Sequence, residues 1–147
     1  MRHWFIDTNV LIDFLTDRQP FAVAANNIFR AAYAGDVRMY AASLSFSNAF
    51  YLMRRSIATS FTTGNASQLA QQQLLKIKPL FTIVSVGDEV LSQALQAGLN
   101  DFEDAIQLFA AQSRPEIELL VTRNGKDFRT SRLPIADPVA AVRMLGY

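Results

Sequence analysis

The amino-acid sequence predicts an α/β protein in which one central parallel sheet is covered by helices on both faces, a three-layer α/β/α sandwich. Short apolar segments of strand length alternate with longer segments of helical periodicity, and this alternation is typical of parallel sheets. The 147 residues are 50% hydrophobic and 18% charged, which suits one compact domain with a sizeable core. We therefore expect residues 1–147 to form a single domain.

Five strands are expected in order along the chain, at residues 3–6, 38–42, 81–84, 117–122 and 133–136. Each is a short apolar run, as strands buried in a parallel sheet are, and the last run has the weakest pattern. Helices are expected at residues 10–15, 21–34, 45–57, 65–76, 88–97, 102–112 and 138–145. Gly35, Gly64, Gly87 and Gly98 stand at the joins, where glycine ends or starts helices at low cost. Residues 59–67 are expected to form a loop.

Composition narrows the chemistry that the chain can support. With no cysteine and one histidine, a disulfide scaffold is excluded and a zinc centre is poorly supplied. A bound metal would have oxygen ligands, which favour a hard cation such as Mg²⁺ or Mn²⁺. The net charge of +1 predicts that any nucleic acid would bind to a local patch. We expect a soluble cytoplasmic protein, because neither a signal peptide nor a membrane-spanning segment is recognisable.

Asp7 is the first candidate functional residue, because it stands where an apolar strand meets an apolar helix. A carboxylate at such a junction is costly to bury for packing alone and usually faces a ligand, often a cation. The alternative is a helix N-cap, a role that Asp, Asn and Thr all fill. Thr8 or Asn9 can fill that role without Asp7.

Two further acidic groups lie at the edges of expected elements. Asp101, Glu103 and Asp104 stand at the start of the helix at 102–112, and Asp127 follows the strand at 117–122. The carboxyl ends of parallel strands share one edge of the sheet, so these groups can meet Asp7 there. Helical spacing directs Asp104, and with it Asp101, towards that site and Glu103 towards water. The alternative is a favourable helix-dipole interaction of about 0.3–1 kcal/mol for acids in a first turn.

Three segments together resemble the PIN-domain nucleases, in particular the VapC-like toxins of bacterial toxin–antitoxin pairs. They read FIDTNVLI from Phe5, DFEDAIQ from Asp101 and VTRNGKDF from Val121. The resemblance implies a parallel α/β/α sandwich and an endoribonuclease that uses Mg²⁺ or Mn²⁺. It also implies a cognate antitoxin protein as partner and self-association into a homodimer.

Carried over residue by residue, the resemblance implies that Asp7, Asp104 and Asp127 are the catalytic acids that hold the metal. It also implies that Asp101 belongs to the outer shell of this metal site. Thr122 and Asn124 share a motif with Asp127 and are implied to orient a water at the cation.

We place Thr122 and Asn124 at the substrate with Arg123 and Lys126, whose positive charge stands near Asp127 in the sequence. Arg129 and Arg132 add to this charge, and Arg54 with Arg55 forms a second basic patch. Solvated surface charge is an equally good interpretation of each basic residue singly. We expect the aromatic residues to lie mostly in the core and not to form a base-stacking surface.

One position departs from the family pattern. The resemblance implies a glutamate in the helix after the second strand, and Asn48 stands there. An amide oxygen can bind a hard cation or a water, but it carries no charge and cannot act as a base. We keep Asn48 among the catalytic positions. The alternative is a catalytically weak or inactive PIN-like domain that binds RNA or a protein partner.

Overall fold

The computed structural model describes residues 1–60 and 65–147, and its centre is a parallel sheet. The strand order is β3-β2-β1-β4-β5, and each neighbouring pair is parallel. The strands are β1 (Arg2–Ile6), β2 (Val37–Ala42), β3 (Phe81–Val84), β4 (Leu119–Val121) and β5 (Ile135–Ala136). All five expected strands are confirmed, although β4 and β5 are shorter than expected.

The described helices cover this sheet. They are α1 (Thr8–Leu15), α2 (Ala22–Ala34), α3 (Ser43–Ser60), α4 (Ala66–Ile77), α5 (Asp88–Gln96), α6 (Phe102–Gln112) and α7 (Pro138–Met144), with the 3₁₀ segments η1 (Lys78–Leu80) and η2 (Gly125–Phe128). Each expected helix is confirmed, and α6 has the expected bounds. No helix of the described ranges 1–60 and 65–147 is long and apolar enough to cross a bilayer.

The expected loop at residues 59–67 is wrong at both of its ends. Thr59 and Ser60 belong to α3, and Ala66 and Ser67 belong to α4. The α3 sequence contains no glycine or proline that would end the helix before Ser60. The Thr59 hydroxyl also donates to the carbonyl of Ser56 in the last turn of α3. Residues 61–64, which include the expected join at Gly64, lie outside the described residues.

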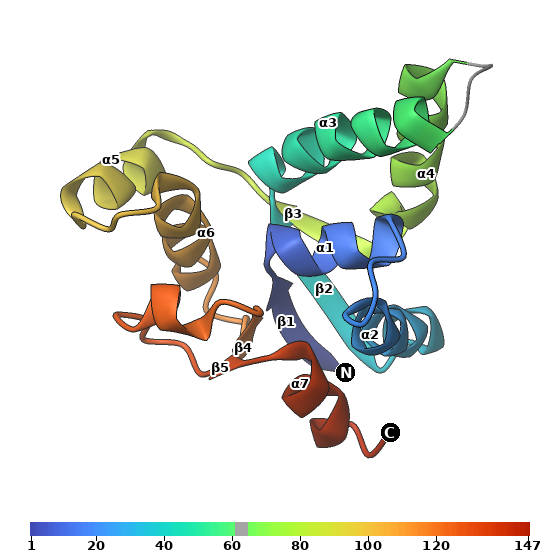
Figure 1. Ribbon diagram of the computed structural model, residues 1–147. Helices are drawn as coiled ribbons and strands as arrows, with labels where there is room; N and C mark the ends of the chain where they lie inside the picture. The colour runs from blue at the N-terminus through green and yellow to red at the C-terminus, as the bar shows by residue number, and fades with distance from the viewer. Residues whose placement is uncertain (61–64) are drawn as a thin grey trace.

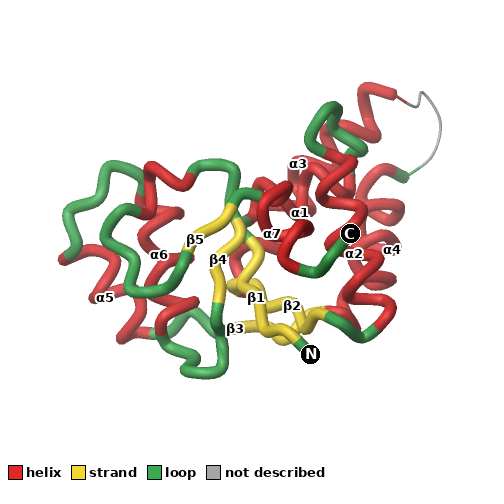
Figure 2. The backbone as a smooth tube through the Cα atoms, turned by 90° about the horizontal axis from the view of Figure 1, so that it is seen from below, coloured by secondary structure: helices red, strands yellow, loops and turns green. Residues whose placement is uncertain are grey.

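Two hydrophobic cores lie on the two faces of the sheet. Side chains alternate across a strand, so Trp4 and Ile6 of β1 pack on one face and Phe5 packs on the other. The first core joins the sheet to α1, α2, α3, α4 and α7, and the second joins it to α5 and α6. Figure 1 shows α5 and α6 on the opposite side of the sheet from α1 and α2, and Figure 2 shows the same layers from below. The three-layer sandwich is thereby confirmed.

The strand order reverses between β1 and β4. The chain runs from β1 outward through β2 to β3, and it then returns to the other side of β1 for β4 and β5. In open α/β sheets, ligands bind beyond the carboxyl ends of the strands at such a point. Asp7 follows β1 and Thr122 follows β4, so both residues stand at the reversal.

Candidate active site

Asp7 is buried, with 2% of its surface exposed, and it accepts a short hydrogen bond. The Thr122 hydroxyl donates to Asp7 Oδ2 at 2.5 Å, and the Thr122 oxygen accepts from the Asn124 amide at 3.0 Å. Asp7 has the N-cap position of α1, but its side chain makes no capping hydrogen bond. Burial raises the pKa of Asp7 above its usual range, although the Thr122 hydroxyl favours the ionised form. Capping therefore does not explain this carboxylate.

Asp104 approaches the same place from α6. Its side chain is 8% exposed, and its backbone amide donates to Asp101 Oδ1 at 3.0 Å, so Asp101 caps the helix. Burial, together with the negative charges of Asp7, Asp101, Asp127 and Glu103, raises the pKa of Asp104 to about 7. Carboxylates that repel one another in a buried place favour either a proton or a cation between them.

A cavity of about 420 Å³, here called the acidic pocket, contains most of the predicted site. It is lined by Asp7, Thr8, Asn9, Ile12, Asn48, Tyr51, Leu52, Asp101, Glu103, Asp104, Gln107 and Asn124. The structure thus brings Asp7, Asp101 and Asp104 together with the half-buried Asn48 from α3. Asn48 lies where a glutamate was expected from the family resemblance.

The expected orientation of Glu103 towards water is wrong. Glu103 is half-buried and lines the acidic pocket, and its charge raises the pKa of both Asp7 and Asp104. Its place follows from Gln107, which stands one helical turn later and lines the same pocket. Side chains at i and i+4 share a helix face. The pocket therefore contains a fourth carboxylate.

Asp127 lies outside the acidic pocket. Its exposed side chain lines a neighbouring cavity of about 410 Å³ with Lys126, Arg129 and Asp101. The η2 segment explains this position, because it buries Phe128 completely and leaves Asp127 and Lys126 on the outside. Asp127 is still close enough for its charge to raise the pKa of Asp104, and Asp101 lines both cavities.

A buried hydrogen-bond network at the wall of the pocket was missed at the sequence level. Gln107 Oε1 accepts from the Thr8 amide at 2.9 Å and from the Thr8 hydroxyl at 3.2 Å, and that hydroxyl also shares a hydrogen bond with Ser45 at 2.7 Å. All three residues are buried. A glutamine within the apolar stripe of α6, one turn after Asp104, is the signal that could have indicated the network. Ser45 offered no comparable signal.

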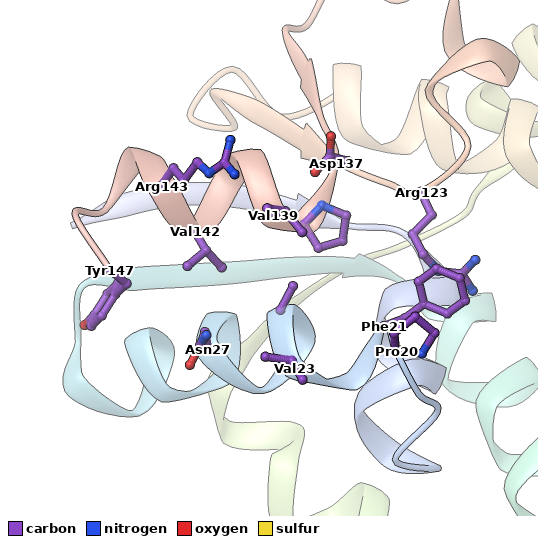
Figure 3. Close-up of a pocket in the computed structure, with 12 residues that line it drawn as sticks. Pro20, Phe21, Val23, Asn27, Arg123, Asp137, Val139, Val142, Arg143 and Tyr147 are labelled. Atoms are coloured by element: carbon purple, nitrogen blue, oxygen red, sulfur yellow. The ribbon is translucent and has the colours of Figure 1, made fainter.

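The structure does not bring Arg123 to the acidic pocket. Its guanidinium donates to the buried Asp13 at 2.6 and 3.1 Å and lies over the Phe21 ring, 4.0 Å from the centroid. It lines a different cavity, of about 750 Å³, between α2 and α7 (Figure 3). Because a buried carboxylate needs a partner, Asp13 accounts for this arginine. The structure thus accounts for Arg123 by an ion pair away from the acidic pocket, and its contact with substrate stays a prediction.

The donor set of the acidic pocket fits a hard cation. Its lining offers carboxylate and amide oxygens, and Asn9 Oδ1 is buried with no hydrogen-bond partner in the described part of the chain. No arginine, lysine or histidine of residues 1–60 and 65–147 forms a salt bridge with Asp7 or Asp104. Over the same ranges, no three acidic or histidine side chains are close enough together to hold a metal ion.

The protein has a three-layer α/β/α fold, and a pocket lined by carboxylates lies where the strand order of its parallel sheet reverses. These two features define its class. The family model described as "PIN domain" matches residues 3–126. The chain belongs to the PIN-domain family, and the resemblance found in its three sequence segments is confirmed at this level. A search of curated protein sequences gave no significant match.

Several solved structures share this fold at low sequence identity. A DNA-bound VapBC from Salmonella typhimurium has a TM-score of 0.67 at 17% identity, with 94% of this chain and 99% of that chain covered. A toxin–antitoxin complex from Klebsiella pneumoniae has a TM-score of 0.61 at 22% identity, covering 91% and 96%. The VapC20 toxin of Mycobacterium tuberculosis, which is named as cleaving the Sarcin-Ricin loop, has a TM-score of 0.61 at 16% identity, covering 86% and 94%.

Proposed function

We propose that this protein is an endoribonuclease that depends on Mg²⁺ or Mn²⁺ and acts in the cytoplasm as the toxin of a toxin–antitoxin pair. The observation that carries the proposal is the burial of Asp7 and Asp104 in one acidic pocket, at the sheet edge of a PIN-domain fold, without a positive side chain. The names of the structural neighbours support the toxin role.

Asp7 and Asp104 would hold the cation, with Asp101 at the rim and Asp127 approaching from the neighbouring cavity. A divalent cation, when bound, supplies positive charge that offsets the charge developing on the phosphate and on the leaving oxygen. Thr122 orients Asp7, and Gln107 fixes the Thr8 backbone beside it. Without a cation, Asp104 can hold a proton near neutral pH, because its pKa is about 7.

Substrate contacts are proposed for the exposed residues at the rim. Asn124 lines the acidic pocket, and Lys126 lines the cavity that contains Asp127. Lys126 can offset the charge of an RNA phosphate there. Thr122 is buried and donates to Asp7, so we propose that it positions this carboxylate and does not touch RNA.

A second candidate function is RNA or protein binding without cleavage. The presence of Asn48 in the acidic pocket favours it, because an amide supplies neither the charge nor the basicity of a glutamate. Cleavage activity that depends on Asp7 would separate the two candidates, since a pure binding domain has none to lose.

An antitoxin partner and a homodimer also belong to the proposal. The neighbours from Klebsiella pneumoniae and Salmonella typhimurium are named as toxin–antitoxin assemblies. A basic side chain of the antitoxin would be attracted to the repelling carboxylates of the pocket. Light scattering on the isolated chain tests the dimer, and a strict monomer would contradict it.

Growth inhibition on expression in bacterial cells tests the toxin role. Asp7→Asn keeps the shape of the side chain and removes its charge, so we expect growth to recover while circular dichroism shows a folded protein. Asp88→Asn is the matched control, because Asp88 is an exposed acid in the first turn of α5. Undiminished inhibition by Asp7→Asn would show that the acidic pocket is not the toxic site.

A further inference from the structure

An aromatic and basic surface on α3 adjoins the acidic pocket. We call Phe50, Tyr51, Arg54 and Arg55 the α3 patch. Tyr51 lines the pocket that contains Asp7 and Asp104, yet 56% of its surface is exposed. Figure 1 shows α3 beside α1, the helix that follows Asp7. The patch therefore begins at the wall of the proposed active site and continues onto the surface.

The side chains of the patch contact one another. The rings of Phe50 and Tyr51 meet edge to face, with centroids 5.0 Å apart and planes at 79°. The Arg54 guanidinium carbon lies 5.2 Å from the Tyr51 centroid and 5.8 Å from that of Phe50. These contacts limit the freedom of the tyrosine ring and place a positive charge beside it.

Arg54 and Arg55 keep their charge available. Both are exposed, and within residues 1–60 and 65–147 neither forms a salt bridge. An acidic pocket repels a polyanion, so a chain that brings RNA there needs positive charge and stacking surface close by. The α3 patch supplies both next to the carboxylates, whereas Arg123 is paired with Asp13.

We propose that Tyr51 stacks on an unpaired nucleobase next to the cleaved phosphate, and that Arg54 and Arg55 bind the adjoining backbone. The substrate class is therefore single-stranded or looped RNA, because a base inside a duplex has both faces covered by its neighbours. This inference rests on the proposed ribonuclease function. It differs from the expectation that no aromatic residue forms a base-stacking surface, and it makes Tyr51 a specificity-determining residue.

Binding of RNA separates this role from catalysis. The Asp7→Asn protein is titrated in Mg²⁺ with a fluorescent single-stranded RNA of mixed sequence and with its duplex, and anisotropy gives the two affinities. Adding Tyr51→Ala should weaken single-strand binding about 5- to 150-fold, the range for loss of one stacked base. Tyr51→Phe should restore it, and duplex binding should be weak and insensitive to Tyr51.

Tyr33→Ala is the matched control, because Tyr33 is also exposed (62%) but lies on α2. Arg54→Ala and Arg55→Ala should reduce the salt dependence of binding, and Arg30→Ala on α2 should not. Equal affinities of the Tyr51→Ala and Tyr33→Ala proteins, or no RNA binding at all, would overturn the inference. So would a change of oligomeric state in Tyr51→Ala with unchanged RNA affinity, which would make the patch a protein interface.

The outcome for Tyr51 is distinguishable from that for the proposed function. In the Asp7-containing protein with Mn²⁺, Tyr51→Ala should raise KM for single-stranded RNA more than it lowers kcat. Cleavage with an unchanged KM would refute the role of Tyr51 and leave the ribonuclease standing. Binding that depends on Tyr51, without cleavage by the parent protein, would support the role of Tyr51 and refute the ribonuclease function.

Discussion

At the scale of single residues, the hydrogen bond from Thr122 to Asp7 holds the carboxylate of the site in place. It joins the ends of β4 and β1, and both side chains are buried. The position of Asp7 was predictable, because an acid directly after an apolar strand has few structural roles. The donor role of Thr122 was not predictable, since a threonine after a strand has many.

Thr122→Val should destabilise the protein by about 1–3 kcal/mol, because it leaves buried Asp7 without its donor. Thr122→Ser keeps the hydroxyl and serves as the control. Urea unfolding in EDTA measures both variants. Equal stability of Thr122→Val and the parent protein would show that the hydrogen bond contributes nothing to the fold.

The raised pKa of Asp104 predicts that the metal-free protein loses stability as pH rises. The folded pKa is about 7 and the ordinary value is 3.8, so between these values the folded state holds a proton that the unfolded state has released. The contribution of this proton to the free energy of unfolding falls as pH rises from about 4, and it levels off above about 7. Melting temperatures in EDTA should fall over that window, and Asp104→Asn should flatten the fall. An identical pH profile in Asp104→Asn would contradict this assignment.

Asn48 differs from the family pattern in charge, and adding that charge tests its place. Asn48→Glu adds a fifth acid to the pocket that contains Asp7, Asp101, Glu103 and Asp104. Metal-free stability should therefore fall, and the rise in melting temperature on adding Mn²⁺ should grow. Ser47→Glu, on an exposed neighbour in α3, is the control. A rise with Mn²⁺ no larger in Asn48→Glu than in the parent would place Asn48 outside the cation site.

At the scale of elements, strand and helix positions were predictable because apolar periodicity reports burial directly. The bounds of α6 follow from a cap at Asp101 and a regular apolar stripe. The end of α3 did not follow, because a polar stretch without proline supports either loop or helix. The 3₁₀ turn of η2 was also missed, and it moves Asp127 out of the pocket that contains Asp7 and Asp104.

The ion pair between Asp13 and Arg123 joins α1 to the segment after β4. Arg123→Ala should cost about 3–5 kcal/mol of stability, because it leaves a buried charge without a partner. Asp13→Asn combined with Arg123→Ala should cost less than Arg123→Ala alone. Chemical denaturation of the three variants measures this. If Arg123→Ala left stability unchanged and increased KM for RNA, Arg123 would be a substrate-contacting residue.

At the scale of the whole molecule, the parallel sheet sets where chemistry can occur. One reversal of strand order brings the end of β1 and the end of β4 together, and α3 and α6 add Asn48 and Asp104 to the same edge. Strand direction was sufficient to predict that the ends of β1 and β4 share this edge with the start of α6, whereas the place of Asn48 was implied by the family resemblance. The sequence was insufficient to predict how the acids divide between two cavities, which depends on side-chain packing around Phe128 and Gln107.

The most direct test is cleavage of single-stranded RNA by the purified protein under single-turnover conditions, with Mn²⁺ titrated from zero. We predict no cleavage in EDTA, cleavage that saturates with Mn²⁺, and a loss of about 100-fold or more in Asp7→Asn and in Asp104→Asn, since a bound cation contributes several kcal/mol to such reactions. The exposed-acid variant Asp88→Asn should match the parent protein. Cleavage that persists in EDTA, or that survives both substitutions, would contradict a cation-dependent site in the acidic pocket.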